Sequence, residues 1–136
     1  MKIILNNHDL SKTLRPFKDI DFVPTMGGIH KGHISLIRRS IQTNKKTIVS
    51  IFINPKQFNN IKDFNSYPAN IKKDLAVLKK IKKLDFVYIP KFMDIYENKE
   101  KSEIKIEKKY KVLCAKYRKG HFEGVLDVMN RLTKLI

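Results

Sequence analysis

The residues best suited to chemistry stand together in His30-Lys31-Gly32-His33, directly after Gly27-Gly28. Paired glycines after an apolar run can adopt positive φ and let a ligand approach the backbone closely. The start of a helix offers unpaired N–H groups and a partial positive charge to an anion. Histidines three residues apart can point to one side of the first turn and donate hydrogen bonds to polyphosphate oxygens as charge develops on them. The segment therefore predicts a nucleotide-binding corner.

Two other interpretations of this corner compete with nucleotide binding. A plain turn followed by two surface histidines needs no ligand at all. A zinc site would also use two imidazoles, although no matching third ligand stands nearby. The location of the segment between an apolar run and a helix favours the nucleotide. Gly32 would leave room for a flat group such as adenine or ribose.

A second polar group follows the next apolar run, which ends near Phe52. Asn54 and Gln57 can donate to and accept from a small polar substrate, with Phe52 and Phe58 as walls. The alternative is a strand terminator with a satisfied amide and two core aromatics. The spacing alone favours that alternative.

A third group lies near the end of the chain, where Arg118 and His121 accompany a glycine ahead of a helix. These side chains could hold phosphates or a carboxylate. In so basic a chain, a basic lead-in to the helix is the favoured alternative. Two other features are interpreted as structural: Asp74 as a solvated helix residue, and Tyr67-Pro68 as the anchor of a loop.

The elements that must position these segments alternate between strands and helices. Strands are predicted at 2–5, 21–24, 46–54 and 85–89, and helices at 8–15 (capped by Asn7), 33–43, 70–82 and 122–136. The charged stretch 97–109 is predicted to be an exposed hairpin or an excursion. The apolar faces expected on the three longer helices are Ile34, Ile37 and Ile41; Ile71, Leu75, Leu78 and Ile81; and Val125, Met129, Leu132 and Ile136.

This alternation predicts a parallel α/β sheet, which buries its strands on both faces. Ligands of such sheets bind beyond the carboxyl ends of the strands. The segments 25–33 and 54–58 each follow a predicted strand. We therefore expect them to form one site.

The composition bounds the class of protein. The 136 residues, 42% of them hydrophobic, fit a single domain, 1–136. The net charge of +16 makes a nucleic-acid-binding module an alternative, but lysines are spread over the whole chain and arginine is scarce. Cys114, the one cysteine, excludes an internal disulfide. With no signal peptide and no membrane-spanning run, we expect a cytoplasmic protein without membrane or specific nucleic-acid partners.

Four ordered blocks, together covering nearly the whole chain, resemble the pantothenate synthetases. The blocks are Val23 to His33 with Ser35-Leu36; Val49 to Phe58; Asp63-Phe64 with Tyr67-Pro68; and Arg118 with Gly120-His121-Phe122 and Gly124-Val125. The His-x-Gly-His motif alone would indicate only the wider nucleotidyltransferase superfamily. The order and spacing of all four blocks are more specific.

The resemblance implies a Rossmann-like parallel sheet and an ATP-dependent ligase that joins pantoate to β-alanine through pantoyl adenylate. It implies Mg²⁺ with the ATP, a homodimer, and pantoate and β-alanine bound in turn by Gln57. His33 would be the proton donor, with His30 beside it on the phosphates. The residues implied to contact ATP are Met26, Gly27, Gly28, Ile29, His30, Lys31, Gly32 and His33. Asn54, Arg118 and His121 are secondary candidates.

Some residues depart from the family pattern. Family chains continue past residue 136 with further strands, phosphate-binding segments and a C-terminal domain, so the domain is expected to be incomplete. Cys114 to Tyr117 replace a stretch of small residues, Lys119 stands in place of a proline, and so does Glu97. Because each electrostatic contact to a reacting phosphate can be worth about 100-fold, a catalytically impaired, ligand-binding remnant is the alternative function.

Overall fold

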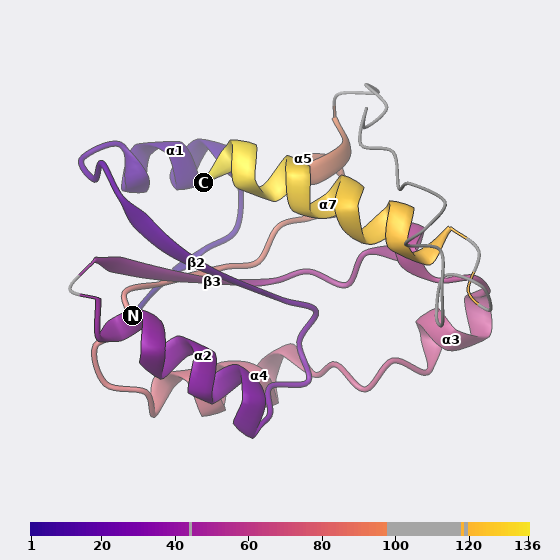
Figure 1. Ribbon diagram of the computed structural model, residues 1–136, viewed down its shortest axis with the longest axis horizontal. Coiled ribbons are helices and arrows are strands. Elements are labelled where there is room, and N and C mark those ends of the chain that lie inside the picture. Colours follow the sequence, from indigo (N-terminus) through magenta and orange to yellow (C-terminus); the bar gives the residue numbers. More distant parts are fainter. Residues whose placement is uncertain (44, 98–117, 119) are drawn as a thin grey trace, which may run out of the picture.

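The computed structural model describes residues 1–43, 45–97, 118 and 120–136, which form a parallel sheet between two layers of helices (Figure 1). The strands are β1 (Lys2–Ile4), β2 (Ile20–Thr25), β3 (Lys46–Ile51) and β4 (Phe86–Tyr88). Their order in the sheet is β1-β4-β3-β2, and every pairing is parallel. The predicted α/β class is confirmed. Cys114 and the stretch 98–109 lie outside the described residues.

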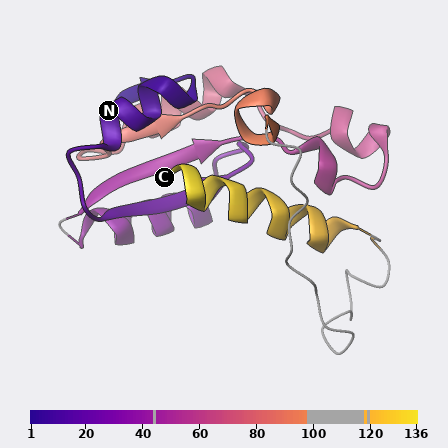
Figure 2. The same cartoon turned by 90° about the horizontal axis from the view of Figure 1, so that it is seen from above.

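Helices cover both faces of the sheet (Figures 1 and 2). One face carries α1 (Asn7–Leu14), α5 (Phe92–Tyr96) and α7 (His121–Leu135), and the other carries α2 (Lys31–Ile41) and α4 (Ile71–Lys79). Between β3 and α4 lie a 3₁₀ turn, η1 (Pro55–Gln57), and the short helix α3 (Ile61–Asn65). Because β2 and β3 run parallel, their carboxyl ends lie at the same edge of the sheet, and η1 begins at that edge.

The central strand β3 supplies apolar side chains to both layers, as its continuous apolar run predicts. Ile48 packs in the cluster beneath α1, α5 and α7, and Val49 packs in the cluster above α2 and α4. Both side chains are fully buried. At the other extreme, β2 lies at one edge of the described sheet, where its exposed Pro24 lacks the N–H that a central strand would need.

Two predictions of local structure are wrong in detail, and two short helices were missed. Asn6, not Asn7, caps α1, and it accepts from the Asp9 N–H at 2.9 Å. The short helices α3 and α5 went unpredicted, because five residues are too few to display a helical period. Ile71 is 45% exposed, because it begins α4 at the rim of the packed layer.

The buried face of α7 is also displaced from the prediction. Its buried residues are Gly124, Val128 and Leu132, of which only Leu132 was expected. The helix presents a glycine to the backbone of η1, and this close approach turns Val125 away from the core toward a pocket. The spacing of apolar residues predicts which large side chains face the core. It cannot identify Gly124, which is buried because its lack of a side chain allows the close approach to η1.

Candidate active site

The histidine corner, residues 27–33, follows β2 and opens α2. His30 is the N-cap of this helix, and its Nδ1 accepts from the Gly32 N–H at 3.1 Å. The His33 Nδ1 accepts in turn from the His30 N–H at 3.4 Å. The two rings lie close, with centroids 4.0 Å apart and planes inclined by 33°. A reciprocal cap of this kind fixes both imidazoles against the first turn of the helix.

These contacts determine where the protons lie on the two imidazoles. A ring nitrogen that accepts an N–H carries no proton, so each neutral ring holds its proton on Nε2. Burial, followed by the neighbouring His30, lowers the pKa of His33 below the usual 6.5, while the Asp74 charge opposes this shift. At neutral pH, His33 is therefore an uncharged ring with Nε2–H as its remaining donor.

The backbone N–H groups at the start of the corner are bonded within the protein. Gly27 donates to Thr25 Oγ1 at 3.2 Å. Gly28 and Ile29 donate to the two carboxylate oxygens of Asp74, at 3.0 Å and 2.8 Å. Contact between these residues and ATP stays a prediction. If it occurs, it does not use these three N–H groups.

The prediction that Asp74 is solvated is wrong. Its side chain is only 4% exposed, because it lies one turn before the fully buried Leu78 on the inner face of α4. The lysine-rich sequence around Asp74 indicated a solvent-facing position, although Asp74 belongs to the buried face of α4. Asp74 also acts on its neighbour Tyr67, whose pKa is raised first by burial and then by this carboxylate.

The space expected beside Gly32 is already filled. A Cβ on Gly32 would lie 2.9 Å from Cε1 of His30, so the missing side chain makes room for the imidazole and not for a flat ligand. Within the described part of the chain, the backbone N–H of Lys31, the first residue of α2, has no hydrogen-bond partner. The corner therefore offers one helix N–H and two Nε2–H groups to an anion.

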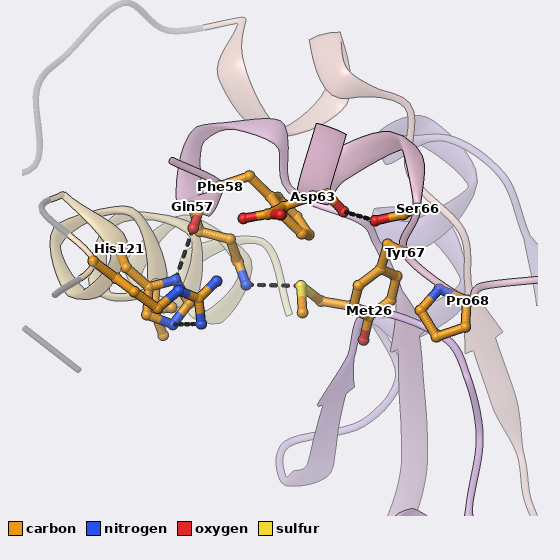
Figure 3. Close-up of a pocket in the computed structure, with 10 residues that line it drawn as sticks. Met26, Gln57, Phe58, Asp63, Ser66, Tyr67, Pro68 and His121 are labelled. Carbon is orange, nitrogen blue, oxygen red and sulfur yellow. Dashed lines mark hydrogen bonds between the residues drawn. The ribbon is translucent and has the colours of Figure 1, made fainter. Parts of the chain in front are cut away.

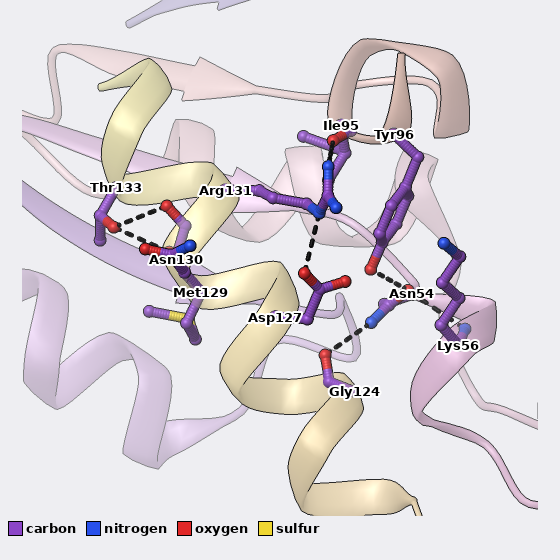
Figure 4. Close-up of polar contacts among 10 residues, drawn as sticks. All are labelled: Asn54, Lys56, Ile95, Tyr96, Gly124, Asp127, Met129, Asn130, Arg131 and Thr133. Carbon is purple, nitrogen blue, oxygen red and sulfur yellow. Dashed lines mark hydrogen bonds and ion pairs between the residues drawn. The ribbon is translucent and has the colours of Figure 1, made fainter. Parts of the chain in front are cut away.

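The Gln57 turn, residues 54–58, follows β3 and is held by the fully buried Asn54 (Figure 4). The Asn54 Oδ1 accepts from the Lys56 N–H at 3.1 Å and the Tyr96 hydroxyl at 3.0 Å. Its Nδ2 donates to the Gly124 carbonyl at 3.1 Å. The amide is engaged within the protein, as the structural alternative predicted. Any contact with substrate would be additional.

The other side chains near this turn divide between core and pocket. Phe52 packs in the core, as the favoured structural alternative predicted, and does not wall a substrate. Phe58 does line the pocket described below. The Gln57 Nε2 donates to the Met26 sulfur at 2.7 Å. A thioether is a weak acceptor, so an oxygen of a bound ligand would replace it readily.

A pocket of about 440 Å³ opens beside the Gln57 turn (Figure 3). Of the segment 25–33, which was expected to share one site with this turn, only Met26 lines the pocket. Its lining residues are Met26, Gln57, Phe58, Asp63, Ser66, Tyr67, Pro68, Arg118, His121 and Val125. The structure thus brings Gln57, Arg118 and His121 together. It also places Tyr67-Pro68 in the pocket wall, beyond the anchoring role expected for them. A pocket with one guanidinium, one amide bonded only weakly to a thioether, and an apolar wall suits a small branched carboxylate.

Helix α7 closes one side of this pocket and fixes the Gln57 turn. His121 Nδ1 lies 2.7 Å from the Gln57 carbonyl, which can only accept, so Nδ1 carries the proton. The Arg118 guanidinium donates to His121 Nε2 at 3.4 Å. A Cβ on Gly124 would lie 2.6 Å from the Lys56 carbonyl oxygen, so only glycine allows this approach.

The zinc alternative and the membrane prediction can both be examined in the described residues. They contain no group of three or more His, Cys, Asp or Glu side chains that could hold a metal ion. His30 and His33 each use Nδ1 to cap the backbone. Every described helix is too short or too polar to cross a membrane.

The pantoate-β-alanine ligase family model matches residues 2–136. The pantothenate synthetase of Pseudothermotoga lettingae is 42% identical over 139 residues, which cover all of this chain and 49% of that protein. That of Staphylococcus haemolyticus is 40% identical and covers 88% of this chain and 42% of its own length. The chain spans about half the length of the curated relatives it matches.

Solved structures agree with these relatives. A Francisella tularensis pantoate-β-alanine ligase complexed with β-γ ATP and β-alanine has a TM-score of 0.91 and 36% identity. The alignment covers 99% of this chain and 53% of that one. Pantothenate synthetase from Thermus thermophilus has a TM-score of 0.90 and 31% identity, over all of this chain and 49% of its own. The chain belongs to the pantoate-β-alanine ligase family.

Proposed function

We propose that residues 1–136 form a nucleotide-binding α/β domain of a ligase that uses ATP to join pantoate to β-alanine. Family membership supports the reaction, and the Francisella complex supports ATP and β-alanine as ligands. The observation that carries the proposal is the pair of imidazoles, each fixed by its Nδ1 and left with a donating Nε2–H. A pocket suited to a small carboxylate lies beside the Gln57 turn, and Met26, which precedes the histidine corner, lines it.

In the proposed first step, a carboxylate oxygen of pantoate attacks the α-phosphorus of ATP. The bond to the bridging oxygen breaks, and pyrophosphate leaves with the electron pair. The charge that develops on the phosphate oxygens needs donors already in place. His33 and His30 supply Nε2–H groups, and the N–H of Lys31 adds the positive end of α2. Because His33 is neutral, it stabilises this charge by donating a hydrogen bond.

The pocket would hold the attacking acid. Pantoate has a carboxylate, two hydroxyls and a branched apolar body. Gln57 offers an amide that its thioether partner releases easily, and Arg118 offers a guanidinium, while Phe58 and Val125 face the apolar body. His121 orients this group through its bonds to Arg118 and to the Gln57 carbonyl. The turn is supported from behind by the buried amide described above.

In the proposed second step, the amine of β-alanine attacks the acyl carbon of pantoyl adenylate. AMP leaves with the electron pair of the acyl–phosphate bond, and the amine loses a proton. Gln57 would receive β-alanine in the same pocket after the adenylate forms. The two steps therefore share one set of side chains.

We also propose Mg²⁺ as the companion of ATP. Mg²⁺ keeps several waters and is commonly held by substrate phosphates with one or two carboxylates. Asp63 is an exposed carboxylate on the pocket lining and fits that limited role. Bound Mg²⁺ would neutralise charge on the triphosphate. A homodimer and a cytoplasmic location stay predictions, which sedimentation and cell fractionation would test.

The experiment that tests the function is exchange of labelled pyrophosphate into ATP, which isolates the adenylation step. We expect exchange that requires pantoate and falls about 100-fold or more in His33→Ala. His8→Ala is the matched control, because His8 is an exposed histidine of α1. Folding of each variant is checked by circular dichroism.

Two outcomes would contradict the proposal. Folded wild-type protein without pantoate-dependent exchange would leave the impaired, ligand-binding alternative. Exchange that survives His33→Ala as well as it survives His8→Ala would remove the histidine corner from the reaction. Polyanion binding that disappears as salt rises would reflect only the net charge of +16.

A further inference from the structure

Asp74 is a buried carboxylate outside every segment to which the sequence assigned chemistry. It lies on α4, 45 residues after Ile29 in the chain, yet its Oδ1 accepts from the Ile29 N–H at 2.8 Å. Its Oδ2 accepts from the Gly28 N–H at 3.0 Å. The side chain is 4% exposed. A buried charge persists where hydrogen bonds compensate for its lost solvation, and these two N–H groups supply such bonds.

The backbone at this point has a conformation that would otherwise attract an anion. Gly27 and Gly28 have φ of +82° and +63°. Successive N–H groups in such a turn converge into a concavity that binds anions. Here the concavity is filled from inside the protein: a Cβ on Gly27 would lie 2.8 Å from the Asp74 Oδ2. The turn and the carboxylate therefore fit each other closely.

We propose that Asp74 is a positioning residue that fixes Gly28 and Ile29 and thereby sets the direction in which His30 and His33 meet the nucleotide. Ile29 directly precedes His30, the N-cap of α2, so a shift of the Ile29 N–H moves both imidazoles. The inference rests on the proposed function for its ligand, ATP. The contact itself does not depend on that function.

Electrostatics separates this role from a simple charge effect. A carboxylate near a triphosphate site repels the ligand, so Coulomb's law alone predicts that removing the Asp74 charge strengthens nucleotide binding. A positioning role predicts the reverse. In Asp74→Asn the amide nitrogen cannot accept, so one of the two backbone N–H groups loses its partner. If the loop then holds the binding geometry only a tenth of the time, the apparent Kd rises about tenfold.

His33 gives a second measure of the same contact. The Asp74 charge acts to raise the pKa of His33, against burial and His30. Removing that charge should lower the His33 pKa further, which the imidazole proton resonances report by NMR. A packing defect remote from the corner would not produce this change.

The test compares wild type, Asp74→Asn and Asp19→Asn by calorimetric titration with ATP and Mg²⁺, without pantoate. Asp19 is an exposed residue between α1 and β2, and its variant makes the same change in net charge. We expect Asp74→Asn to weaken ATP binding about tenfold and Asp19→Asn to leave it nearly unchanged. Equal or tighter binding by folded Asp74→Asn would overturn the inference.

Amide hydrogen exchange of the wild-type protein keeps the inference testable if Asp74→Asn does not fold. We expect the amide hydrogens of Gly28 and Ile29 to be protected, since both are bonded to a buried carboxylate. Exchange at the rate of an open chain would overturn the proposed contact. Wild-type protein that protects these amides but binds no ATP would instead refute the proposed function, with the Asp74 contact intact.

Discussion

The histidine corner and the Gln57 turn both follow a strand of the same sheet, but they are held in different ways. In the corner, the caps that fix His30 and His33 join residues two and three positions apart. In the turn, Asn54 bonds to a residue 70 positions away, and the Gln57 carbonyl to one 64 positions away. The corner is thus built mainly by its own sequence, and the turn mainly by α7.

This difference separates the two substrates of the proposed first step, ATP at the corner and pantoate at the turn. The corner can present donors to a nucleotide once β2 and α2 are formed, with Asp74 as its anchor from α4. The turn presents Gln57 correctly only when α7 is docked on η1. Changes in α7 should therefore affect pantoate more than ATP.

The largest expected effect is that of Gly124→Ala, which should detach α7 from the Gln57 turn. The new Cβ would lie 2.6 Å from the Lys56 carbonyl oxygen and 2.8 Å from Gln57 Cα, and backbone atoms cannot rotate away. We expect the free energy of unfolding to fall by about 3 kcal/mol, measured by urea denaturation. Pantoate binding should weaken more than ATP binding.

Gly120→Ala is the control for this substitution. Gly120 has φ of +79°, and among the described residues no atom other than those of its chain neighbours lies within 4 Å of a built Cβ, so only backbone strain of about 1 kcal/mol is expected. Equal losses of stability in the two variants would show that the contact between α7 and η1 is not tight.

A smaller effect is expected from Tyr96→Phe, which removes one hydroxyl from the support of the turn. Burial, more than the nearby Asp127, raises the pKa of Tyr96 to about 12, so the hydroxyl stays protonated and donates to Asn54 at 3.0 Å. Its loss should cost about 1 kcal/mol of stability. Isothermal titration should show weaker pantoate binding and unchanged ATP binding.

Tyr88→Phe is the matched control, because the Tyr88 hydroxyl donates to Asn7 of α1 and not to the turn. A comparable loss of stability with unchanged pantoate binding is expected there. If both tyrosine variants weaken pantoate binding equally, Asn54 does not transmit the effect to Gln57.

The same contrast explains what the sequence could predict. The parallel sheet follows from β-branched runs between amphipathic helices, and the histidine corner follows from residues that lie within one turn of each other. The burial of Asp74 could have been anticipated, since it lies four residues before Leu78, the other buried residue of α4. Lys72 and Lys73, which directly precede it, suggested a solvated face instead.

The pocket was harder to predict, because its walls come from distant segments. No local pattern places His121 beside the Gln57 carbonyl, or Gly124 against Lys56. His121 and Gly124 were singled out by the resemblance to a family. The spacing of residues alone favoured structural roles for the segments around Asn54 and His121. For Asn54 the structural role is the one observed, since its amide bonds within the protein.

The smallest expected effect concerns the corner and depends on pH. The His33 pKa is lowered in the folded protein, so the unfolded chain binds more protons between that pKa and 6.5. Stability should therefore rise with pH across this window and be lost as the pH falls through it. Urea denaturation between about pH 5 and pH 7.5 measures the slope, which should be smaller in His33→Gln. His8→Gln should keep the wild-type slope, because His8 is exposed on α1. Identical slopes in the wild type and His33→Gln would mean that burial of the corner does not hold His33 neutral.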